Sequence, residues 1–387
     1  MSEYYWQSHP YTVIGFLAIG LLIALGNSLF IHRLRRKALP PGQSPFVSIL
    51  VPARNEAQNV EACVRSLLAQ QYPAFEVLVL DDHSTDATHA LLEEIKREKP
   101  GLIILSGTSL PPGWLGKHWA CHQLARTARG ELLLFTDADT RHEPDALRDS
   151  VATLLERRVD LLTAFPREEV ITWGEKLTVP ILGFALFSFV PVFLARWRGL
   201  SRLSMTIGQY MLFRRTAYEA VGGFEAIRAH PVDDVALGRR ILSHGYRWLL
   251  VDGTEHVHCR MYRDFDAALA GFTKNLFAFF DYHLFLYLLA WLWIGFVFLE
   301  PLLVILLGWL GRPPAYFPAP LAWIAVGESI LLFAFAYRRS RLPLYLVWLY
   351  PVSIAIFVLM ALRSLNFAWH GRLDWKDRNL PKPVIRL

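Results

Sequence analysis

Two aspartates form an Asp-x-Asp pair at the end of an apolar run in the middle of the chain. Asp137 and Asp139 directly follow residues 131–136, which are rich in leucine. After a buried strand, such a pair places two hard oxygen ligands on one turn, and Mg²⁺ and Mn²⁺ favour one or two carboxylates together with phosphate oxygens. The pair therefore indicates a divalent-metal site for a phosphorylated ligand. Asp-x-Asp is a common motif, but its position at the end of a strand makes the prediction of a metal site stronger.

A second acidic pair, Asp81 and Asp82, ends an earlier apolar run at residues 76–80. Adjacent carboxylates repel each other, so they are seldom placed together for stability. They can accept hydrogen bonds from a base or a ribose. The alternative is a helix N-cap, and we expect Ser84 or Thr85 to cap the next helix. A cap needs only one such residue, which leaves Asp81 and Asp82 for a ligand.

Two further clusters stand where a helical pattern begins. Pro52, Arg54 and Glu56 follow the first apolar run, and ligands of open α/β sheets bind at the carboxyl ends of strands. Asp233 and Asp234 open a later helical pattern. The helix dipole favours acidic residues there, and a carboxylate in this place could equally be a general base that takes a proton from an acceptor hydroxyl. The spacing leaves both roles open.

Alternating strand and helix patterns must position these clusters. The short runs that are apolar throughout fit strands buried on both faces of a mostly parallel sheet. Their alternation with helical patterns predicts a doubly wound, Rossmann-like α/β fold. The predicted strands are 47–53, 76–80, 102–105, 131–136, 205–213 and 247–251, and the predicted helices are 56–70, 86–98, 118–129, 144–157 and 233–244.

The composition and one N-terminal segment indicate a membrane protein. Apolar residues make up 53% of the chain and charged residues 19%, where globular chains carry about 25% charged residues. The uncharged run 11–31 has the length of a membrane-crossing helix. It lacks the basic start and the small-residue cleavage site of a secretory signal, so we expect a retained anchor. The basic cluster after it predicts that the next segment is cytoplasmic, and its members are Arg33, Arg35, Arg36 and Lys37.

Three apolar segments near the C-terminus, 284–310, 319–337 and 343–362, are further candidate spans. Glu300 lies inside the first, beside Pro301. An ionisable residue at that depth is either functional or is brought to an interface by a bend at the proline. Three full crossings would place the basic C-terminal tail outside, against the positive-inside rule. This suggests that one segment is re-entrant or consists of two half-helices.

The apolar segment 179–195 differs from these spans. Pro180 and Pro191 interrupt it, and Arg196 and Arg198 follow. The segment is short for a span, and we interpret it as an interfacial helix that lies against the membrane.

The cysteines, histidines and net charge argue against other classes of site. Cys63, Cys121 and Cys259 are widely separated and form no disulfide or metal motif. His256 and His258 beside Cys259 superficially resemble metal ligands, but alternating residues of this kind more often mark one face of a strand end. The net charge of +6 is modest. Because no long basic face is interleaved with aromatic residues, nucleic-acid binding is not predicted.

Together the clusters resemble family 2 glycosyltransferases of the GT-A fold. The resemblance rests on the order Val-Pro-Ala-Arg-Asn-Glu, Asp-Asp-His-Ser-Thr-Asp, Asp-Ala-Asp and Asp-Asp-Val-Ala-Leu-Gly. Further motifs look like the membrane subgroup associated with hopanoid and carotenoid glycosylation, and they lie at residues 112–120, 208–210, 260–262 and 271–275. The resemblance covers about residues 47–275 and the tail around Trp375.

The resemblance implies a role for each cluster. Asp234 is implied as the general base, with Asp233 beside it. Asp139 and Asp137 are implied as ligands of Mg²⁺ or Mn²⁺. Residues implied to contact the acceptor or close the site are Gln209, Trp375 and Arg378, and residues implied to bind the donor are Pro52, Arg54, Glu56, Asp81, Asp82, Lys117 and Asp137.

Two positions depart from the pattern of the resembled subgroup. Asp233 stands where Glu is frequent, which keeps the charge. Asp377 stands where Gly is usual in a Trp-Lys-Gly-Arg tail, which weakens the roles implied for Trp375 and Arg378.

We therefore predict a membrane-bound, inverting hexosyltransferase that moves a sugar from a nucleotide-sugar, expected to be a UDP-sugar, to a hydroxyl of a lipid-type acceptor. The expected acceptors are a hopanoid, a carotenoid, or another isoprenoid or glycolipid. One alternative is a processive polysaccharide synthase, against which the absence of a Gln-x-x-Arg-Trp motif counts. The other is a non-catalytic membrane scaffold with a retired transferase domain.

The predicted organisation is a multi-pass protein of a bacterial-type inner (plasma) membrane with a cytoplasmic catalytic domain. Its predicted parts are an anchor at 1–38 with its span at 11–31, a GT-A domain at 44–282 with the interfacial helix 179–195, a membrane block at 283–365, and a basic tail at 366–387.

Overall fold

The computed structural model describes residues 2–35, 37, 39, 42, 44–195, 200–372, 374, 375, 378, 379 and 382–387. The chain divides into two compact units, neither of which is one continuous segment. The first unit comprises Met1–Leu29, Val170–Pro191 and Tyr262–Leu387, and the second comprises Phe30–Glu169 and Val192–Met261. The predicted domain 44–282 is thus divided between both units, because two of its segments pack with the apolar helices of the first.

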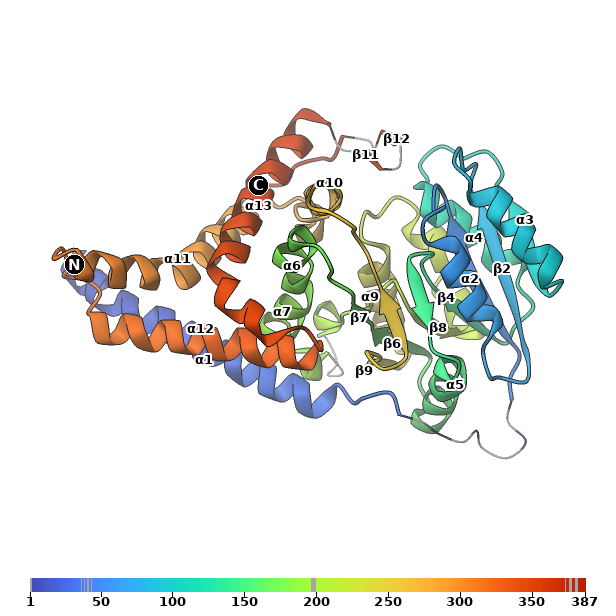
Figure 1. The fold of residues 1–387 in the computed structure, drawn as a ribbon, viewed down its shortest axis with the longest axis horizontal. Coiled ribbons are helices and arrows are strands. Elements are labelled where there is room, and N and C mark those ends of the chain that lie inside the picture. The colour runs from blue at the N-terminus through green and yellow to red at the C-terminus, as the bar shows by residue number, and fades with distance from the viewer. Residues whose placement is uncertain are drawn as a thin grey trace. The chain divides into compact units, whose positions relative to one another are not determined.

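The second unit contains a seven-stranded sheet with the order β3-β2-β1-β4-β8-β6-β9 (Figure 1). Strand β8 runs antiparallel to its neighbours β4 and β6, and the other pairs are parallel. The mostly parallel α/β sheet predicted from the sequence is thereby confirmed. The strands are β1 (Val47–Ala53), β2 (Phe75–Asp81), β3 (Leu102–Ser106), β4 (Leu132–Phe135), β6 (Leu161–Phe165), β8 (Met211–Arg214) and β9 (Trp248–Asp252).

Helices cover both faces of this sheet, which explains why its strands are apolar throughout. Val47, Ile49 and Val51 of β1 belong to one core with buried residues of α2, α3 and α5. Helix α4 lies against β1 and β2. The helices of this unit are α2 (Val60–Leu68), α3 (Thr88–Glu98), α4 (Gly116–Thr127), α5 (Ala146–Arg157), α8 (Arg215–Ala220) and α9 (Asp233–Ser243).

The predicted strand at 205–213 is wrong over most of its length, because β8 begins at Met211. The preceding backbone bonds to side chains in place of a strand partner. The Ile207 N–H donates to the Thr163 hydroxyl at 2.9 Å, and the Gly208 N–H donates to the Asp234 carboxylate at 3.0 Å. Tertiary contacts that the local sequence does not reveal therefore turn this segment.

A second, three-stranded sheet lies in the same unit, and only its strand at 257–259 has a counterpart in the sequence analysis, in the strand end inferred from His256 and His258. Its order is β5-β10-β7. Strand β5 (Thr140–His142) is antiparallel to β10 (Val257–Cys259), and β10 is parallel to β7 (Arg167–Glu168). Each strand has two or three residues, which is too short for a periodic pattern to show.

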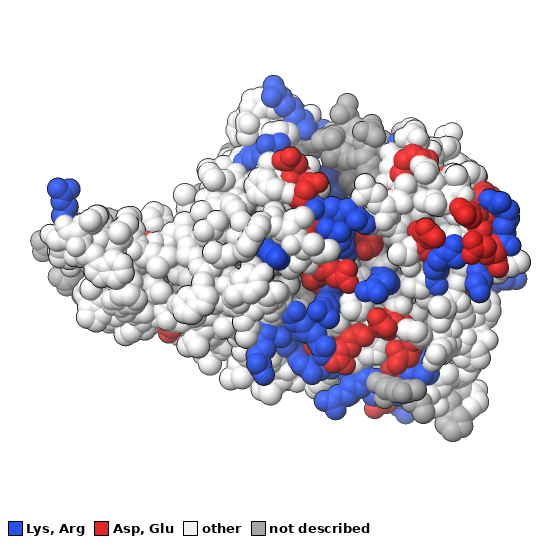
Figure 2. All heavy atoms as spheres, viewed as in Figure 1, with Lys and Arg blue, Asp and Glu red and all other residues white. Residues whose placement is uncertain are grey.

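The first unit contains four helices that are long and apolar enough to cross a membrane, judged by length and composition within the described residues. These segments are Ser8–Phe30, Leu284–Trp309, Ala319–Arg339 and Leu344–His370. Figure 2 shows few charged side chains over the ends of α11 and α12, at the left of the view. The helices of this unit are α1 (Ser2–Phe30), α6 (Trp173–Thr178), α7 (Pro180–Phe189), α10 (Phe265–Asn275), α11 (Leu284–Trp309), α12 (Ala319–Arg339) and α13 (Tyr350–His370).

Helix α11 packs on both α12 and α13, and α13 runs at a steep angle to α12 (Figure 1). The rings of Phe16 in α1 and Trp293 in α11 meet edge to face with centroids 5.9 Å apart. A Cβ atom at Gly20 would lie 3.2 Å from Leu332 of α12, so the glycine permits a close approach of α1. Arg363, in the second half of α13, is exposed and lies over the ring of Phe367.

Glu300 is paired within the first unit. Its carboxylate lies 2.6 Å from His9 Nε2 and accepts a hydrogen bond from the Tyr316 hydroxyl at 3.0 Å. Helix α11 continues through Pro301 to Trp309. His9 and Tyr316 thus pair with the Glu300 carboxylate, and both sequence-based alternatives for Glu300 stay predictions.

Helix α7 covers the first part of the segment predicted as an interfacial helix at 179–195. It ends at Phe189, before Pro191, and seven of its ten residues are buried. Asn27 of α1 donates to the Phe187 and Val190 carbonyls at 3.0 and 2.8 Å, which satisfies backbone acceptors at the end of α7. Neighbouring helices therefore account for the apolar sequence of α7. Arg196 and Arg198, like Arg36 of the first basic cluster, lie outside the described residues.

The C-terminal tail forms a short hairpin of β11 (Asp374–Trp375) and β12 (Arg378–Asn379). Of Trp375 and Arg378 only the backbone is described, and Lys376 and Asp377 lie outside the described residues.

Candidate active site

The Asp-x-Asp pair lies on a turn that leaves the carboxyl end of β4 and enters β5. Thr136 holds the start of this turn, because its N–H donates to the Leu50 carbonyl at 3.1 Å and its hydroxyl donates to the Gln209 carbonyl at 2.7 Å. The Thr140 hydroxyl closes the turn on the Asp137 carbonyl at 2.7 Å. Both carboxylates are therefore carried by a backbone that two threonines fix.

Lys117, in the first turn of α4, joins this turn to α9. Its Nζ lies 2.8 Å from Asp137 Oδ1 and 3.4 Å from Asp233 Oδ2. Burial works against the charged ammonium, yet the charges of Asp137 and Asp233 raise the pKa of Lys117 well above its ordinary value. Lys117 is consequently a permanent cation at the carboxyl edge of the sheet.

Asp234 and Asp233 open α9 and differ in their protonation. Burial of the carboxyl group and then the charge of Asp233 raise the pKa of Asp234 to about 7. Burial also opposes ionisation of Asp233, but the charges of Lys117 and then of His118 lower the pKa of Asp233 to about 2. Asp234 therefore has the pKa expected of a general base at neutral pH, and Asp233 stays ionised.

Backbone N–H groups fix the orientation of Asp234. Its Oδ2 accepts from Gly208 at 3.0 Å, and its Oδ1 accepts from Val235 at 2.7 Å. A Cβ atom at Gly208 would lie 3.5 Å from Asp234 Oδ2 and 3.6 Å from Lys117 Nζ. The glycine turn thus passes directly beside both functional groups, and Gln209 follows it next to Thr136.

A second group of loops lies at the carboxyl ends of β1 and β2. The Arg54 guanidinium donates to the Asp82 carbonyl at 2.6 Å and to the His83 carbonyl at 3.2 Å. Asn55 and His83 both adopt a left-handed backbone, with φ of 51° and 56°. In the structure Arg54 therefore ties the two loops together, and its role in donor binding stays a prediction.

Asp81 bonds within its own loop, and the predicted cap is wrong. Asp81 Oδ1 accepts from the Ser84 N–H at 3.0 Å, and its Oδ2 lies 3.1 Å from His89 Nδ1. Ser84 and Thr85 do not cap α3, which begins at Thr88. The Ser84 hydroxyl instead accepts from the Asn55 N–H at 3.0 Å, because the two loops face each other across neighbouring strands.

The remaining residues predicted to bind the sugar donor lie in or beside the loops that follow β1 and β2. Glu56 Oε2 accepts from the Asn59 side chain at 3.0 Å, and the Glu56 N–H donates to the Thr88 hydroxyl at 2.7 Å. Pro52 is the sixth residue of β1 and is half-buried. Asp82 is 4% exposed, and its N–H donates to the Ala53 carbonyl at 2.8 Å.

The structure also brings a carboxylate to the Asp-x-Asp turn that the sequence analysis missed. Glu168 of β7 is 7% exposed, and its Oε2 has no hydrogen-bond partner within the described part of the chain. Burial and then the charge of Asp139 raise the pKa of Glu168 to about 8. Glu168 follows the carboxyl end of β6, so the strand-end rule that selected the other carboxylates would also have selected it.

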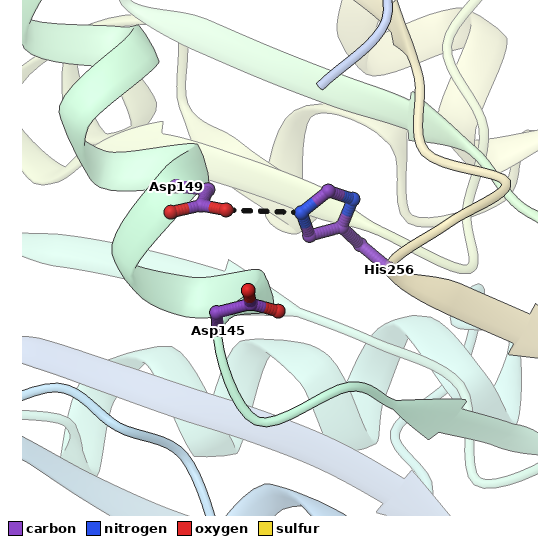
Figure 3. Close-up of side chains that lie close together, drawn as sticks. All are labelled: Asp145, Asp149 and His256. Atoms are coloured by element: carbon purple, nitrogen blue, oxygen red, sulfur yellow. Dashed lines mark hydrogen bonds and ion pairs between the residues drawn. The ribbon is translucent and has the colours of Figure 1, made fainter. Parts of the chain in front are cut away.

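His256 and His258 do not converge on one ligand. His258 lies 3.3 Å from Glu143 and 3.4 Å from Glu169, and His256 Nε2 lies 3.0 Å from Asp149. Figure 3 shows His256 directed at Asp149 of α5, with Asp145 below.

Asp145, Asp149 and His256 offer ligand atoms that lie within 4.8 Å of one another, close enough to hold a metal ion. Asp149 already pairs with the Arg148 guanidinium at 2.8 Å and accepts from the Lys37 N–H at 3.2 Å. These contacts link α5 to the loop before β10.

Known proteins match this arrangement in sequence and in fold. Residues 48–222 match the model of glycosyl transferase family 2, a span that includes both aspartate pairs of the main sheet. A 4,4'-diaponeurosporenoate glycosyltransferase of Staphylococcus aureus (strain USA300) is 26% identical over 284 residues, which cover 70% of this chain and 70% of that protein. A mannosyltransferase from Pyrobaculum calidifontis, solved in complex with GDP-Man and Mn²⁺, has a TM-score of 0.54 at 18% identity and covers 96% of this chain and 100% of its own.

Proposed function

Because the chain is a family 2 glycosyltransferase with a GT-A fold, we propose that it transfers a sugar from a nucleotide-sugar to a lipid acceptor with Asp234 as general base. The observation that carries this proposal is the convergence of Asp234 and Lys117 with the Asp-x-Asp turn. Lys117 lies within 4 Å of Asp137 and Asp233. The binding site for the sugar donor and the general base Asp234 are thereby assigned to adjacent positions.

The donor diphosphate is assigned to the Asp-x-Asp turn and Lys117. Asp139 and Asp137 supply hard oxygen ligands of the kind that Mg²⁺ and Mn²⁺ favour, so the residues fit a divalent cation. When bound, the cation neutralises charge that develops on the departing diphosphate. Lys117 adds a permanent positive charge, and a UDP-sugar is our proposed donor. GDP-Man and Mn²⁺ in the mannosyltransferase support the donor class.

The acceptor proton is assigned to Asp234. A hydroxyl near Asp234 Oδ2 would lose its proton to this carboxylate as its oxygen attacks the anomeric carbon, and the bond to the diphosphate would break on the opposite side. One displacement of this kind inverts the anomeric centre. General-base assistance contributes about 10²–10⁴-fold to the rate.

A lipid acceptor is supported by the four membrane-length apolar helices and by the relative named for diaponeurosporenoate. That name denotes a carboxylate, which favours a second candidate reaction, the formation of a glycosyl ester. A carboxylate acceptor is already ionised at neutral pH and needs no base. The two reactions therefore differ in their dependence on Asp234.

We also propose a multi-pass arrangement in a bacterial-type inner membrane with the second unit in the cytoplasm. Helices α1, α11 and α12 are assigned as crossings. Helix α13 is assigned to the interface, because it crosses α12 steeply (Figure 1) and exposes Arg363. Three crossings place the basic tail on the cytoplasmic side, in agreement with the positive-inside rule.

The test is a transfer assay with the full chain in nanodiscs. Purified protein is incubated with Mn²⁺ or Mg²⁺, a panel of UDP- and GDP-sugars, and lipid extract, and lipid masses are recorded. We expect one lipid to gain a single hexose mass, and Asp234→Asn to abolish the gain. Glu94→Gln, an exposed carboxylate on α3, is the control.

Each alternative has its own outcome in this assay. Long polymers would support a processive synthase. Equal product from wild type and Asp234→Asn would refute the base and favour the glycosyl ester. No transfer with any donor in this assay, together with no nucleotide binding measured by calorimetry, would favour a non-catalytic scaffold.

A further inference from the structure

We propose that Glu168 is a third carboxylate of the metal site, where it accepts a hydrogen bond from a water molecule of the bound ion. This inference rests on the proposed function, because it takes Asp139 and Asp137 as the residues that hold a divalent cation. It assigns a positioning role to a side chain that the sequence motifs do not include.

The small sheet places Glu168 beside the Asp-x-Asp turn. Cys259 of β10 pairs with Thr140 on one side and with Glu168 on the other. Residues paired in this way direct their side chains to the same face, and neighbouring strands are about 4.8 Å apart. Thr140 directly follows Asp139. Glu168 therefore lies across one strand from the turn that carries the metal ligands.

One carboxyl oxygen of Glu168 is buried without a hydrogen-bond partner among the described residues. This oxygen is Oε2, and the side chain is 7% exposed. A buried carboxyl oxygen without a hydrogen-bond donor costs free energy, and a ligand that donates a hydrogen bond to it would remove that cost. The next residue, Glu169, differs in this respect, because it contacts Arg141 at 3.1 Å and His258 at 3.4 Å.

A hydrated cation supplies the missing partner. Mg²⁺ and Mn²⁺ in such sites keep several water ligands in addition to one or two carboxylates. A water bound on the side of Asp139 that faces Cys259 would direct a hydrogen toward Glu168. The positive charge of Lys117 is already paired with the carboxylates of Asp137 and Asp233. Groups that orient metal ligands from outside typically change metal affinity by about 10–100-fold when replaced.

The experiment measures Mn²⁺ binding by the full chain in detergent, without donor or acceptor, by electron paramagnetic resonance. We expect Glu168→Gln to weaken Mn²⁺ binding by about 10-fold or more. Glu168→Asp, which keeps the charge, should recover part of this loss. Glu169→Gln is the matched control and should bind Mn²⁺ as wild type does, and thermal melting of the metal-free variants checks their folding.

Asp139→Asn is the reference that separates two failures. If Asp139→Asn weakens Mn²⁺ binding and Glu168→Gln does not, Glu168 is a buried acid without a role at the metal, and the inference is overturned while the donor site stands. If neither variant changes binding, the proposed metal site itself is wrong. Equal losses in Glu168→Gln and Glu169→Gln would indicate a general disturbance of β7 and would also overturn the inference.

Discussion

Replacing Asp233 by Asn tests whether Asp234 is a base whose pKa is set by its neighbour. The pKa of Asp234 is raised from 3.8 to about 7, by burial and then by the charge of Asp233. Two unit charges a few ångströms apart at an effective dielectric constant of about 20 repel by a few kcal/mol, which corresponds to about 2 pKa units. The charge of Lys117, which lowers the pKa of Asp234, remains in the variant. We therefore expect Asp233→Asn to move the pKa of Asp234 from about 7 toward about 5.

The sign of the effect follows from the chemistry. A general base acts when it is ionised, so the rate should rise with pH through the pKa of Asp234. At pH 6 about 10% of the wild-type base is ionised, compared with about 90% in the Asp233→Asn variant, by simple titration around these midpoints. The ratio of the rates at pH 6 and pH 8 should therefore increase from about 0.1 to about 0.9.

The assay is the initial rate of nucleoside diphosphate release at saturating donor and acceptor across this pH range. The ratio of two rates is used because Asp233→Asn also alters the contacts of Lys117 and is expected to lower the absolute rate. Glu94→Gln, on an exposed face of α3, should keep the wild-type ratio. A midpoint that stays at the wild-type pH, or moves to higher pH, in Asp233→Asn would refute the electrostatic assignment of the base.

Three further variants test the architecture around the site. Lys117→Gln removes the cation at the diphosphate position, and calorimetry should show UDP binding weaker by about 10–100-fold; unchanged affinity would exclude this position. Gly238→Ala places a Cβ atom against the Thr206 hydroxyl oxygen, so α9 should shift and the melting temperature should fall. Adding Thr206→Ala should restore much of the loss, and an unchanged melting temperature in Gly238→Ala would contradict the packing. Asn27→Ala leaves carbonyls at the end of α7 without their donor and should cost about 1–3 kcal/mol of unfolding free energy in detergent, whereas the exposed Asn366→Ala should cost little; equal losses would argue against the cap.

Much of the fold was predictable because it depends on local pattern. The strands 47–53 and 76–80 appear as β1 and β2, within one residue or so of their observed bounds. Their continuous apolar composition reflects burial on both faces, and burial on both faces requires helices between the strands. The helix predicted at 233–244 appears as α9, because apolar residues recur along the side of it that is buried.

The predictions that failed concern segments whose partners are distant in sequence. Residues 205–210 have strand-like composition, but Thr163 and Asp234 bind their N–H groups and turn the chain. Ser84 and Thr85 have the composition of a cap, but they bond to the loop after β1, where Asn55 Oδ1 accepts from the Thr85 N–H at 2.8 Å. In both cases a side chain from another loop supplied a hydrogen bond that local propensity could not anticipate.

What the sequence by itself determined is the set of carboxylates at strand ends and the alternation that brings strand ends to one edge. Asp81, Asp137 and Asp234 follow from these two rules together with the order of motifs. The tertiary structure alone decided which groups interact and how they are charged. Lys117 contacts Asp137 and Asp233, and Glu168 lies one strand away from Thr140, where the charge of Asp139 acts on it. The physical reason is that a pKa depends on burial and on charges within a few ångströms, and those distances exist only after folding.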